Sequence, residues 1–114
     1  MSAAADAARV ADRRAAGQLR AGAPDAFAAF AQLNGHVASD DGEIPRRYRE
    51  LIAVGVALTT QCTTCLDAHV KAAKQAGASE QEIAETTYIA AAIRAGGAVV
   101  HGRLALQQYD AAEG

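Results

Sequence analysis

The sequence is poor in aromatic residues, with two phenylalanines, three tyrosines and no tryptophan among its 114 residues. Alanine is correspondingly frequent, because 31 residues are alanine and hydrophobic residues together make up 51% of the chain. Alanine is the best helix former, but it buries little apolar surface, so one copy of the chain gains little stability from its core. We therefore expect closely packed helices and an oligomer that supplies further burial.

The sequence also lacks an excess of charge of either sign and any long apolar run. The formal net charge of −2 argues against a nucleic-acid partner. The longest uncharged run has 16 residues, from Leu51 to Leu66, and a membrane-spanning helix needs roughly 20 apolar residues. The N-terminus shows no continuous apolar stretch of a signal peptide. These absences predict a cytoplasmic protein with no nucleic-acid partner and no membrane partner. We interpret the arginines near the N-terminus as one solvated helix face: Arg9, Arg13, Arg14 and Arg20.

No segment sustains the period-two alternation of a β-strand, and the breakers fall at helix-sized intervals. Both prolines suit helix starts, Gly77 suits a helix C-cap, and residues 79–82 form an S-x-x-E capping box. Gly96-Gly97 predicts either a break or a close backbone contact. We expect an all-α, single-domain helical bundle of about six helices. Five of them span about 3–20, 45–60, 62–76, 79–94 and 98–109. The other begins at Pro24, has Phe27, Phe30, Leu33 and Val37 on one face, and ends at Asn34-Gly35 and SDDGE. The helix over 45–60 is apolar all round after its first turn, so we expect it to be buried as the central helix.

Cysteine is nearly absent, and both copies lie in the stretch CTTCLDAH, residues 62–69. A helix that begins at Cys62 places Cys62, Cys65 and His69 at i, i+3 and i+7, on one face. Two cysteines one helical turn apart can close a disulfide, and an imidazole beside them can accept a thiol proton. In a reducing cytosol a lone pair of this kind is more often catalytic or metal-binding than structural. The pattern favours a redox-active pair.

Two other interpretations of the cluster remain open. Zinc could be bound if His36, His101 or Glu50 completed the ligand set, although zinc sites usually draw ligand pairs from separate elements and no second paired motif exists. Alternatively, the cysteines are small buried hydrophobic residues.

Tyr88 could line a pocket or pack in the core.

Glu50 is a carboxylate on an apolar helix face, because Val54 and Ala57 follow it at i+4 and i+7. We predict that it points toward the core and meets His69 across an antiparallel helix hairpin. Glu50 would then orient the imidazole, which would handle the proton of the Cys65 thiol. The alternative is an exposed Glu50 that pairs with Arg46 or Arg47.

Together these residues give the pattern E-x11-C-x-x-C-x3-H, which resembles the alkylhydroperoxidase D-like (AhpD-like) branch of the carboxymuconolactone decarboxylase superfamily. The surrounding run IPRRYRELIAVGVALTTQCTTCLDAHVKAAKQAGASEQEIAET also resembles the helix order of that family. The resemblance spans residues 24–110 and leaves 1–23 as an N-terminal helical extension and 111–114 as a tail.

The resemblance implies an alkylhydroperoxidase-like thiol oxidoreductase that needs no metal and no haem cofactor. Cys65 would attack a hydroperoxide or disulfide substrate and Cys62 would resolve it, while His69 activates Cys65 and Glu50 completes the proton relay. An external dithiol electron donor would recycle the disulfide, and the protein would assemble as a homo-oligomer, a trimer or a hexamer.

Two features qualify these roles. A helix N-terminus favours a thiolate at Cys62, whereas the i+4 spacing to His69 favours Cys65, and we choose Cys65 as the attacking residue. Thr64 stands where some peroxidase members carry a histidine, so thiol-disulfide exchange is the more general expectation. A carboxymuconolactone decarboxylase-like lyase and a non-catalytic oligomeric or zinc-binding module are the alternatives.

Overall fold

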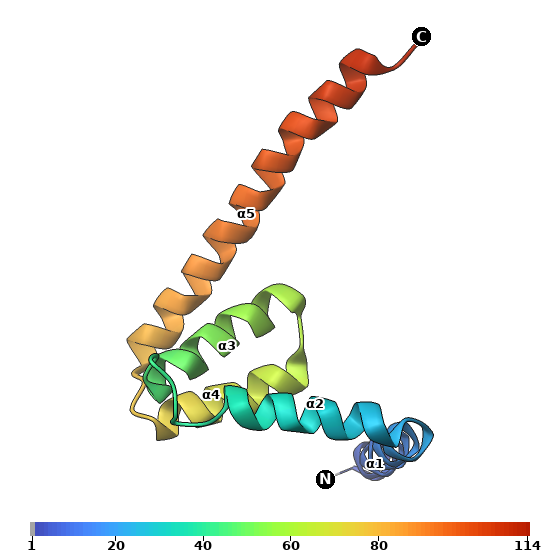
Figure 1. Ribbon diagram of the computed structural model, residues 1–114, viewed down its shortest axis with the longest axis vertical. Helices are drawn as coiled ribbons and strands as arrows, with labels where there is room; N and C mark the ends of the chain where they lie inside the picture. Colours follow the sequence, from blue (N-terminus) through green and yellow to red (C-terminus); the bar gives the residue numbers. More distant parts are fainter. Residues whose placement is uncertain (1) are drawn as a thin grey trace. The chain divides into compact units, whose positions relative to one another are not determined.

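Five helices form the regular secondary structure of residues 2–114, the range that the computed structural model describes (Figure 1). The helices fall into two compact units, one that ends at Ser39 and one over Asp40–Gly114, and each is described by itself. No strand occurs within the described range, so the predicted all-α class is confirmed. The helices are α1 (Ala3–Gly22), α2 (Pro24–Val37), α3 (Arg46–Thr60), α4 (Thr63–Gln75) and α5 (Glu80–Ala111).

The first unit consists of α1 and α2. Ser2 caps α1, because its hydroxyl oxygen accepts a hydrogen bond from the Ala5 N–H at 3.1 Å, and Pro24 occupies the first turn of α2. The Arg20 guanidinium lies over the Phe27 ring, 5.2 Å from its centroid. Neither helix contains a buried residue, although α2 has the apolar stripe that its sequence predicts: Phe27, Phe30, Leu33 and Val37.

The second unit is a hairpin of α3 and α4 with α5 packed on α3, so α3 is central as predicted (Figure 1). Its buried apolar residues are Val54, Ala57, Ala73 and Ala90, three of which are alanine. The prediction that α3 is buried on all sides is wrong, because Ile52 and Val56 are more than half exposed on the face toward α5. The core of one copy is therefore small.

Helix α4 ends at a Schellman motif, in which the Ala78 N–H donates to the Ala73 carbonyl at 2.9 Å and the Gly77 N–H donates to the Lys74 carbonyl at 3.1 Å. Gly77 has φ +95°, a conformation that a side chain disfavours, so the predicted C-cap glycine is confirmed. The turn leads directly into the predicted capping box, in which Ser79 and Glu82 hydrogen-bond reciprocally.

The C-terminal helix is continuous, which corrects the expected count of six helices to five. Gly96 and Gly97 neither break α5 nor contact another segment, since a Cβ added at either would meet nothing within 4 Å in the described chain. Glycine costs about 1 kcal/mol relative to alanine in a helix, and the alanine-rich flanks offset that cost. The glycine pair is therefore a short segment without side chains within an exposed helix.

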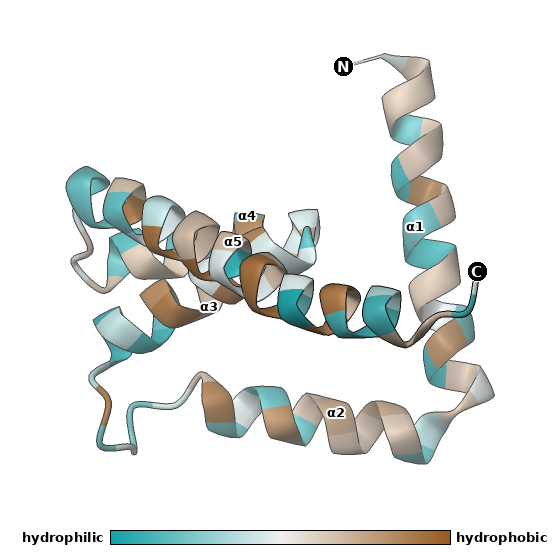
Figure 2. Ribbon diagram, turned by 90° about the horizontal axis from the view of Figure 1, so that it is seen from above, coloured by the Kyte–Doolittle hydropathy of each residue, from teal (hydrophilic) through white to brown (hydrophobic). Residues whose placement is uncertain are grey.

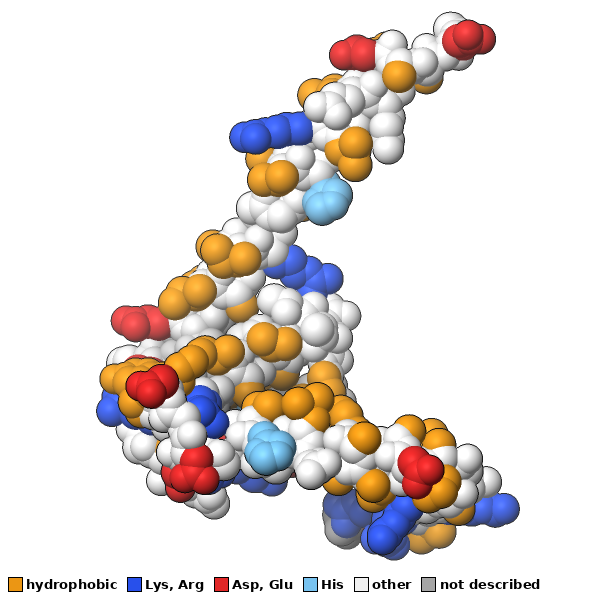
Figure 3. All heavy atoms as spheres, viewed as in Figure 1, with side chains coloured by type: hydrophobic (Ala, Val, Ile, Leu, Met, Phe, Trp, Pro, Cys, Tyr) orange, Lys and Arg blue, Asp and Glu red, His pale blue; other side chains and the backbone are white. Residues whose placement is uncertain are grey.

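Large apolar side chains are exposed all along α5, as Figure 3 shows, and Figure 2 colours the hydrophobic positions of this helix brown. Tyr88 is 76% exposed, so it lies neither in the core nor in a pocket of this chain, contrary to both expectations. By length and mean hydropathy α5 could also cross a membrane. This is weak evidence, because Arg94 and Arg103 interrupt the apolar stretch and Arg94 donates a hydrogen bond to the Thr59 carbonyl of α3.

An ion pair joins the start of α3 to the start of α5, where the Arg47 guanidinium donates to the Glu82 carboxylate. The Ser79 backbone N–H also donates to this carboxylate at 2.8 Å. These two hydrogen bonds, the Ser79 bond first, lower the pKa of Glu82 below its ordinary value.

Glu82 therefore couples the stability of the fold to pH. Because the folded state holds Glu82 ionised more strongly than the unfolded state does, its contribution is complete above the ordinary glutamate pKa of about 4.3 and is lost as the pH falls through the lowered value. Glu82→Gln should flatten the fall in the free energy of unfolding below about pH 4.3, as urea titrations at several pH values would measure. Glu85→Gln, an exposed carboxylate on the same helix, is the control. Equal pH profiles for wild type and Glu82→Gln would contradict the coupling.

Candidate functional site

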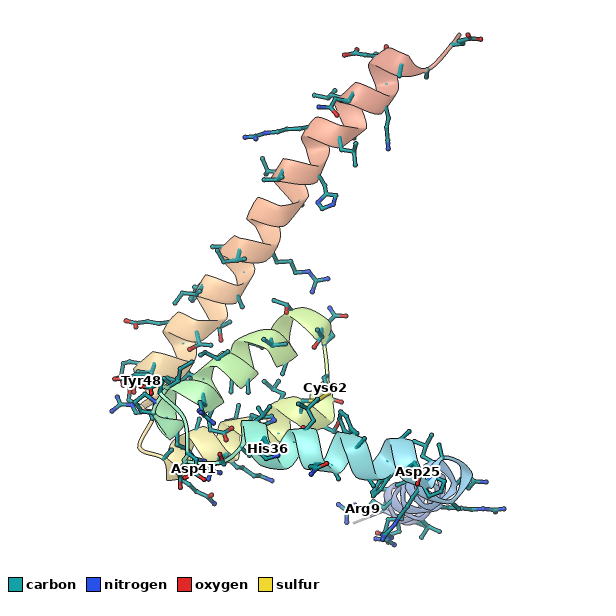
Figure 4. The ribbon with its side chains drawn as sticks, in the orientation of Figure 1. Arg9, Asp25, His36, Asp41, Tyr48 and Cys62 are labelled. Atoms are coloured by element: carbon teal, nitrogen blue, oxygen red, sulfur yellow. A yellow bond between two sulfur atoms is a disulfide. The ribbon has the colours of Figure 1, made fainter. Side chains whose placement is uncertain are left out.

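The two cysteines form a disulfide at the turn between α3 and α4, where Figure 4 labels Cys62. Gln61 adopts a left-handed conformation with φ 56°, which ends α3, and Cys62 is the N-cap of α4. The Cys62 sulfur accepts a hydrogen bond from the Cys65 N–H at 3.3 Å, and the Thr64 hydroxyl oxygen lies 3.7 Å from the same sulfur. Two donors thus face Cys62, which is half-buried, whereas Cys65 is exposed.

Glu50 and His69 meet across the hairpin of α3 and α4. Glu50 is 3% exposed, beside the buried Val54 and Ala57, so the prediction that it points inward is confirmed. The His69 Nδ1 lies 2.6 Å from the Glu50 Oε2. A carboxylate without a proton only accepts hydrogen bonds, so in that form Nδ1 is the donor, and Nε2 of a neutral imidazole is then an acceptor.

Glu50 also has a partner on its own helix, because its Oε1 lies 3.6 Å from the Arg46 Nε. The sequence alternative, in which Glu50 pairs with Arg46, is therefore correct about the contact. It is wrong about exposure, because Glu50 is buried. The i,i+4 spacing of Arg46 and Glu50 is the sequence signal for this contact.

The third element of the predicted relay is Cys65, which precedes His69 by four residues on α4. Side chains at i and i+4 of a helix lie on one face with Cβ atoms about 5–6 Å apart. The structure joins the four predicted residues in two contacts, the Cys62–Cys65 disulfide and the Glu50–His69 hydrogen bond, and Cys65 and His69 are one helical turn apart on α4. A buried carboxylate that orients an imidazole, one turn from a cysteine, is an arrangement suited to moving a thiol proton.

The other two histidines of the chain are exposed. His101 is exposed on α5, and its Nδ1 lies 3.1 Å from the Gly97 carbonyl oxygen. His36 is exposed in α2, and Asp67 pairs with Lys71 along α4. Among residues 2–114 no group of three or more histidine, cysteine or acidic side chains is arranged to hold a metal ion, so the zinc interpretation gains no ligand set there.

Comparison with known proteins gives a family match over most of the chain. The model of the family described as "Carboxymuconolactone decarboxylase family" matches residues 24–108. A protein of Paracoccus denitrificans described as uncharacterised protein 4 in the cox locus is 42% identical over 97 residues, which are 83% of this chain and 84% of that protein. An uncharacterised protein of Cupriavidus necator is 31% identical over 95 residues, or 83% of each chain.

A solved structure agrees with these sequence matches. The crystal structure of a protein from Methanobacterium thermoautotrophicum is 31% identical to this chain and superimposes with a TM-score of 0.65. The match covers 73% of this chain and 94% of that one.

The disulfide closes a loop of only four residues, so its entropic contribution to stability is small, about 2 kcal/mol. We predict that the protein stays folded when the disulfide is reduced and loses about this much free energy of unfolding, as denaturant titrations with and without dithiothreitol would measure. The double variant Cys62→Ser, Cys65→Ser should match the reduced protein, since serine also caps helices, and should not respond to the reductant. Unfolding on reduction would instead identify the bond as a structural cross-link.

Proposed function

Because the chain belongs to the carboxymuconolactone decarboxylase family, of which the AhpD-like branch is a part, we propose that it is a thiol oxidoreductase that reduces a hydroperoxide or disulfide with the Cys62–Cys65 pair. The observation that carries the proposal is the hydrogen bond between the buried Glu50 carboxylate and His69, one helical turn from Cys65. A cysteine pair alone would fit a structural disulfide, but the buried relay beside it fits proton transfer.

In the peroxide reaction the Cys65 thiol gives its proton to His69 Nε2, and the thiolate attacks one peroxide oxygen. A sulfur–oxygen bond forms and the oxygen–oxygen bond breaks. The departing alkoxide takes the proton from His69 and leaves as an alcohol, while Cys65 becomes a sulfenic acid. The Cys62 thiol then attacks the Cys65 sulfur, water leaves and the disulfide forms. An external dithiol donor reduces this disulfide and is itself oxidised.

The roles of the two cysteines follow from their surroundings. Cys65 is exposed and shares a helix face with His69, which suits the residue that meets the substrate. Cys62 is half-buried, and its sulfur faces the Cys65 N–H and the Thr64 hydroxyl. These two hydrogen-bond donors stabilise negative charge on the Cys62 sulfur. Cys62 is therefore suited to leave as a thiolate when the external dithiol attacks Cys65.

Thr64 limits the peroxidase assignment. Threonine cannot exchange a proton near neutral pH as a histidine does, so the Glu50–His69 pair must carry the proton transfer. Disulfide substrates demand less of that pair, because a thiolate leaves a disulfide more readily than an alkoxide leaves a peroxide. The proposal therefore includes both substrate classes.

A lyase that acts on a lactone, the activity in the family name, is the alternative in the same family. Lactone chemistry requires an acid or a base but no cysteine pair. The pairing of Cys62 and Cys65 beside the relay favours thiol chemistry, and lactone turnover by a variant without both cysteines would favour the lyase.

We also propose that the protein is cytoplasmic and assembles as a homo-oligomer, a trimer or a hexamer. Four residues of α5 form an apolar stripe at spacings of four, seven and four: Ile89, Ile93, Val100 and Leu104. This spacing is that of a helix–helix seam. The first two residues also line an open groove of about 440 Å³ between α3 and α5. A second copy is the occupant we propose, because it brings an identical apolar helix and the core of one copy is small.

The first test measures free thiols before and after addition of hydrogen peroxide or a small disulfide. The reduced wild type should lose two thiols, and Cys65→Ser should lose its reaction because its attacking sulfur is gone. Glu50→Gln should react about 10–100-fold more slowly, within the range for general acid–base catalysis. Asp67→Asn, which removes an exposed carboxylate on α4, should react like the wild type. Full activity in Cys65→Ser would refute the assigned role.

The second test measures the mass of the protein in solution by light scattering. The wild type should be an oligomer, and Ile93→Glu should be a monomer, since burial of a charge in an apolar seam is strongly unfavourable. Gln81→Glu adds the same charge at an exposed position outside the stripe and should remain an oligomer. A monomeric wild type, or an oligomeric Ile93→Glu, would refute this use of the stripe.

A further inference from the structure

The first turn of α3 carries charges that its own helix dipole disfavours. Arg46, Arg47 and Arg49 lie there without an acidic residue, although the positive end of a helix favours anions. Two of these arginines have partners outside α3, because Arg47 binds Glu82 of α5 and the Arg49 Nε donates to the Ile44 carbonyl at 2.9 Å. Arg46 contacts the proposed relay, because its Nε lies 3.6 Å from the Glu50 Oε1. A conflict with a local rule of this kind is typical of functional positions.

Glu50 is a buried carboxylate with each oxygen assigned to a different partner. Its Oε2 faces His69 at 2.6 Å, and its Oε1 faces Arg46 at 3.6 Å. A carboxylate in an apolar environment is unfavourable unless charge and hydrogen bonds compensate it. His69 compensates with one N–H when its ring is neutral, whereas the arginine charge is permanent. Arg46 is therefore the partner that places a fixed positive charge beside Oε1.

We propose that Arg46 is a positioning residue of the relay, which holds the Glu50 carboxylate turned so that Oε2 faces His69 Nδ1. This inference rests on the function proposed above. Arg46 acts through Glu50 and does not touch the reacting sulfur. Glu50 in turn keeps the hydrogen of His69 on Nδ1, and Nε2 remains free to accept the Cys65 proton.

A second carboxylate orients Arg46 from the other side. The Asp40 Oδ1 lies 3.9 Å from the Arg46 Nη1, so the guanidinium contacts two carboxylates, Asp40 in the loop before α3 and Glu50 in the hairpin. Asp40 is 77% exposed, and such an exposed pair is weak in water. The Asp40–Arg46 pair therefore orients the guanidinium of Arg46 and adds little to the stability of the fold.

The surroundings of Arg46 allow it to be replaced without disturbance of the core. Its side chain is 42% exposed and lines an open polar cavity of about 470 Å³ together with Pro45 and Gln75. A shorter side chain at this position leaves no void among packed apolar residues. Variants of Arg46 should therefore fold.

The test compares Arg46→Gln, Arg46→Lys and the control Arg49→Gln, which removes the same charge from the same helix turn. In reduced protein labelled with ¹⁵N, we expect the His69 ring of the wild type to carry its hydrogen on Nδ1. Arg46→Gln should shift part of the population to the other tautomer, and Arg46→Lys should restore most of it. With hydrogen peroxide, Arg46→Gln should react about tenfold more slowly, Arg46→Lys should recover, and Arg49→Gln should match the wild type.

The two readouts separate this inference from the proposed function. A wild type inert to peroxide and to disulfides would refute the proposed function, while the tautomer of His69 would still test Arg46. An unchanged tautomer in Arg46→Gln would overturn the inference. An equal slowing in Arg49→Gln would also overturn it, because the effect would then be one of net charge. A lower melting temperature of Arg46→Gln with an unchanged tautomer would assign Arg46 a purely structural role.

Discussion

The hydrogen bond between the buried carboxylate of Glu50 and His69 is the contact on which the site depends. It joins α3 to α4 beside the buried Val54 and Ala57. The packing of the two helices therefore also fixes how Glu50 and His69 face each other. A buried charge imposes strict requirements on its surroundings, since each oxygen needs a partner. His69 and Arg46 meet that requirement from opposite sides. The rest of the hairpin positions these groups relative to the cysteine pair.

The turn between α3 and α4 positions the cysteine pair that the proposed reaction uses. The left-handed Gln61 ends α3 and makes Cys62 the N-cap of α4, so Cys65 falls one turn inside the helix and His69 one turn further. Cys62 then faces backbone and hydroxyl donors, and Cys65 shares its helix face with the imidazole. This division gives two chemically similar sulfurs different environments, as a thiol that attacks and a thiol that leaves require.

Much of the fold could be predicted from local sequence patterns. The capping box at Ser79 and the left-handed Gly77 are set by neighbouring residues, and both are confirmed. The inward direction of Glu50 followed from the apolar residues one and two turns after it, and this is confirmed as well. The errors concern features that depend on the whole structure. Gly96-Gly97 carries a local signal for a break, but the alanine-rich helix continues through it. Burial of Tyr88 and of all faces of α3 could not be judged from sequence, because it depends on neighbouring surfaces and not on periodicity.

The central claim is that Glu50 and His69 act on Cys65. The most direct measurement is the second-order rate constant for reaction of Cys65 with hydrogen peroxide in a Cys62→Ser background, where no resolving cysteine contributes. Replacement of His69 by glutamine in that background should slow the reaction by about 10²–10⁴-fold, and replacement of Glu50 by glutamine should slow it by a part of that factor. A rate constant that neither replacement changes would show that the cysteine reacts without the relay and would contradict the claim.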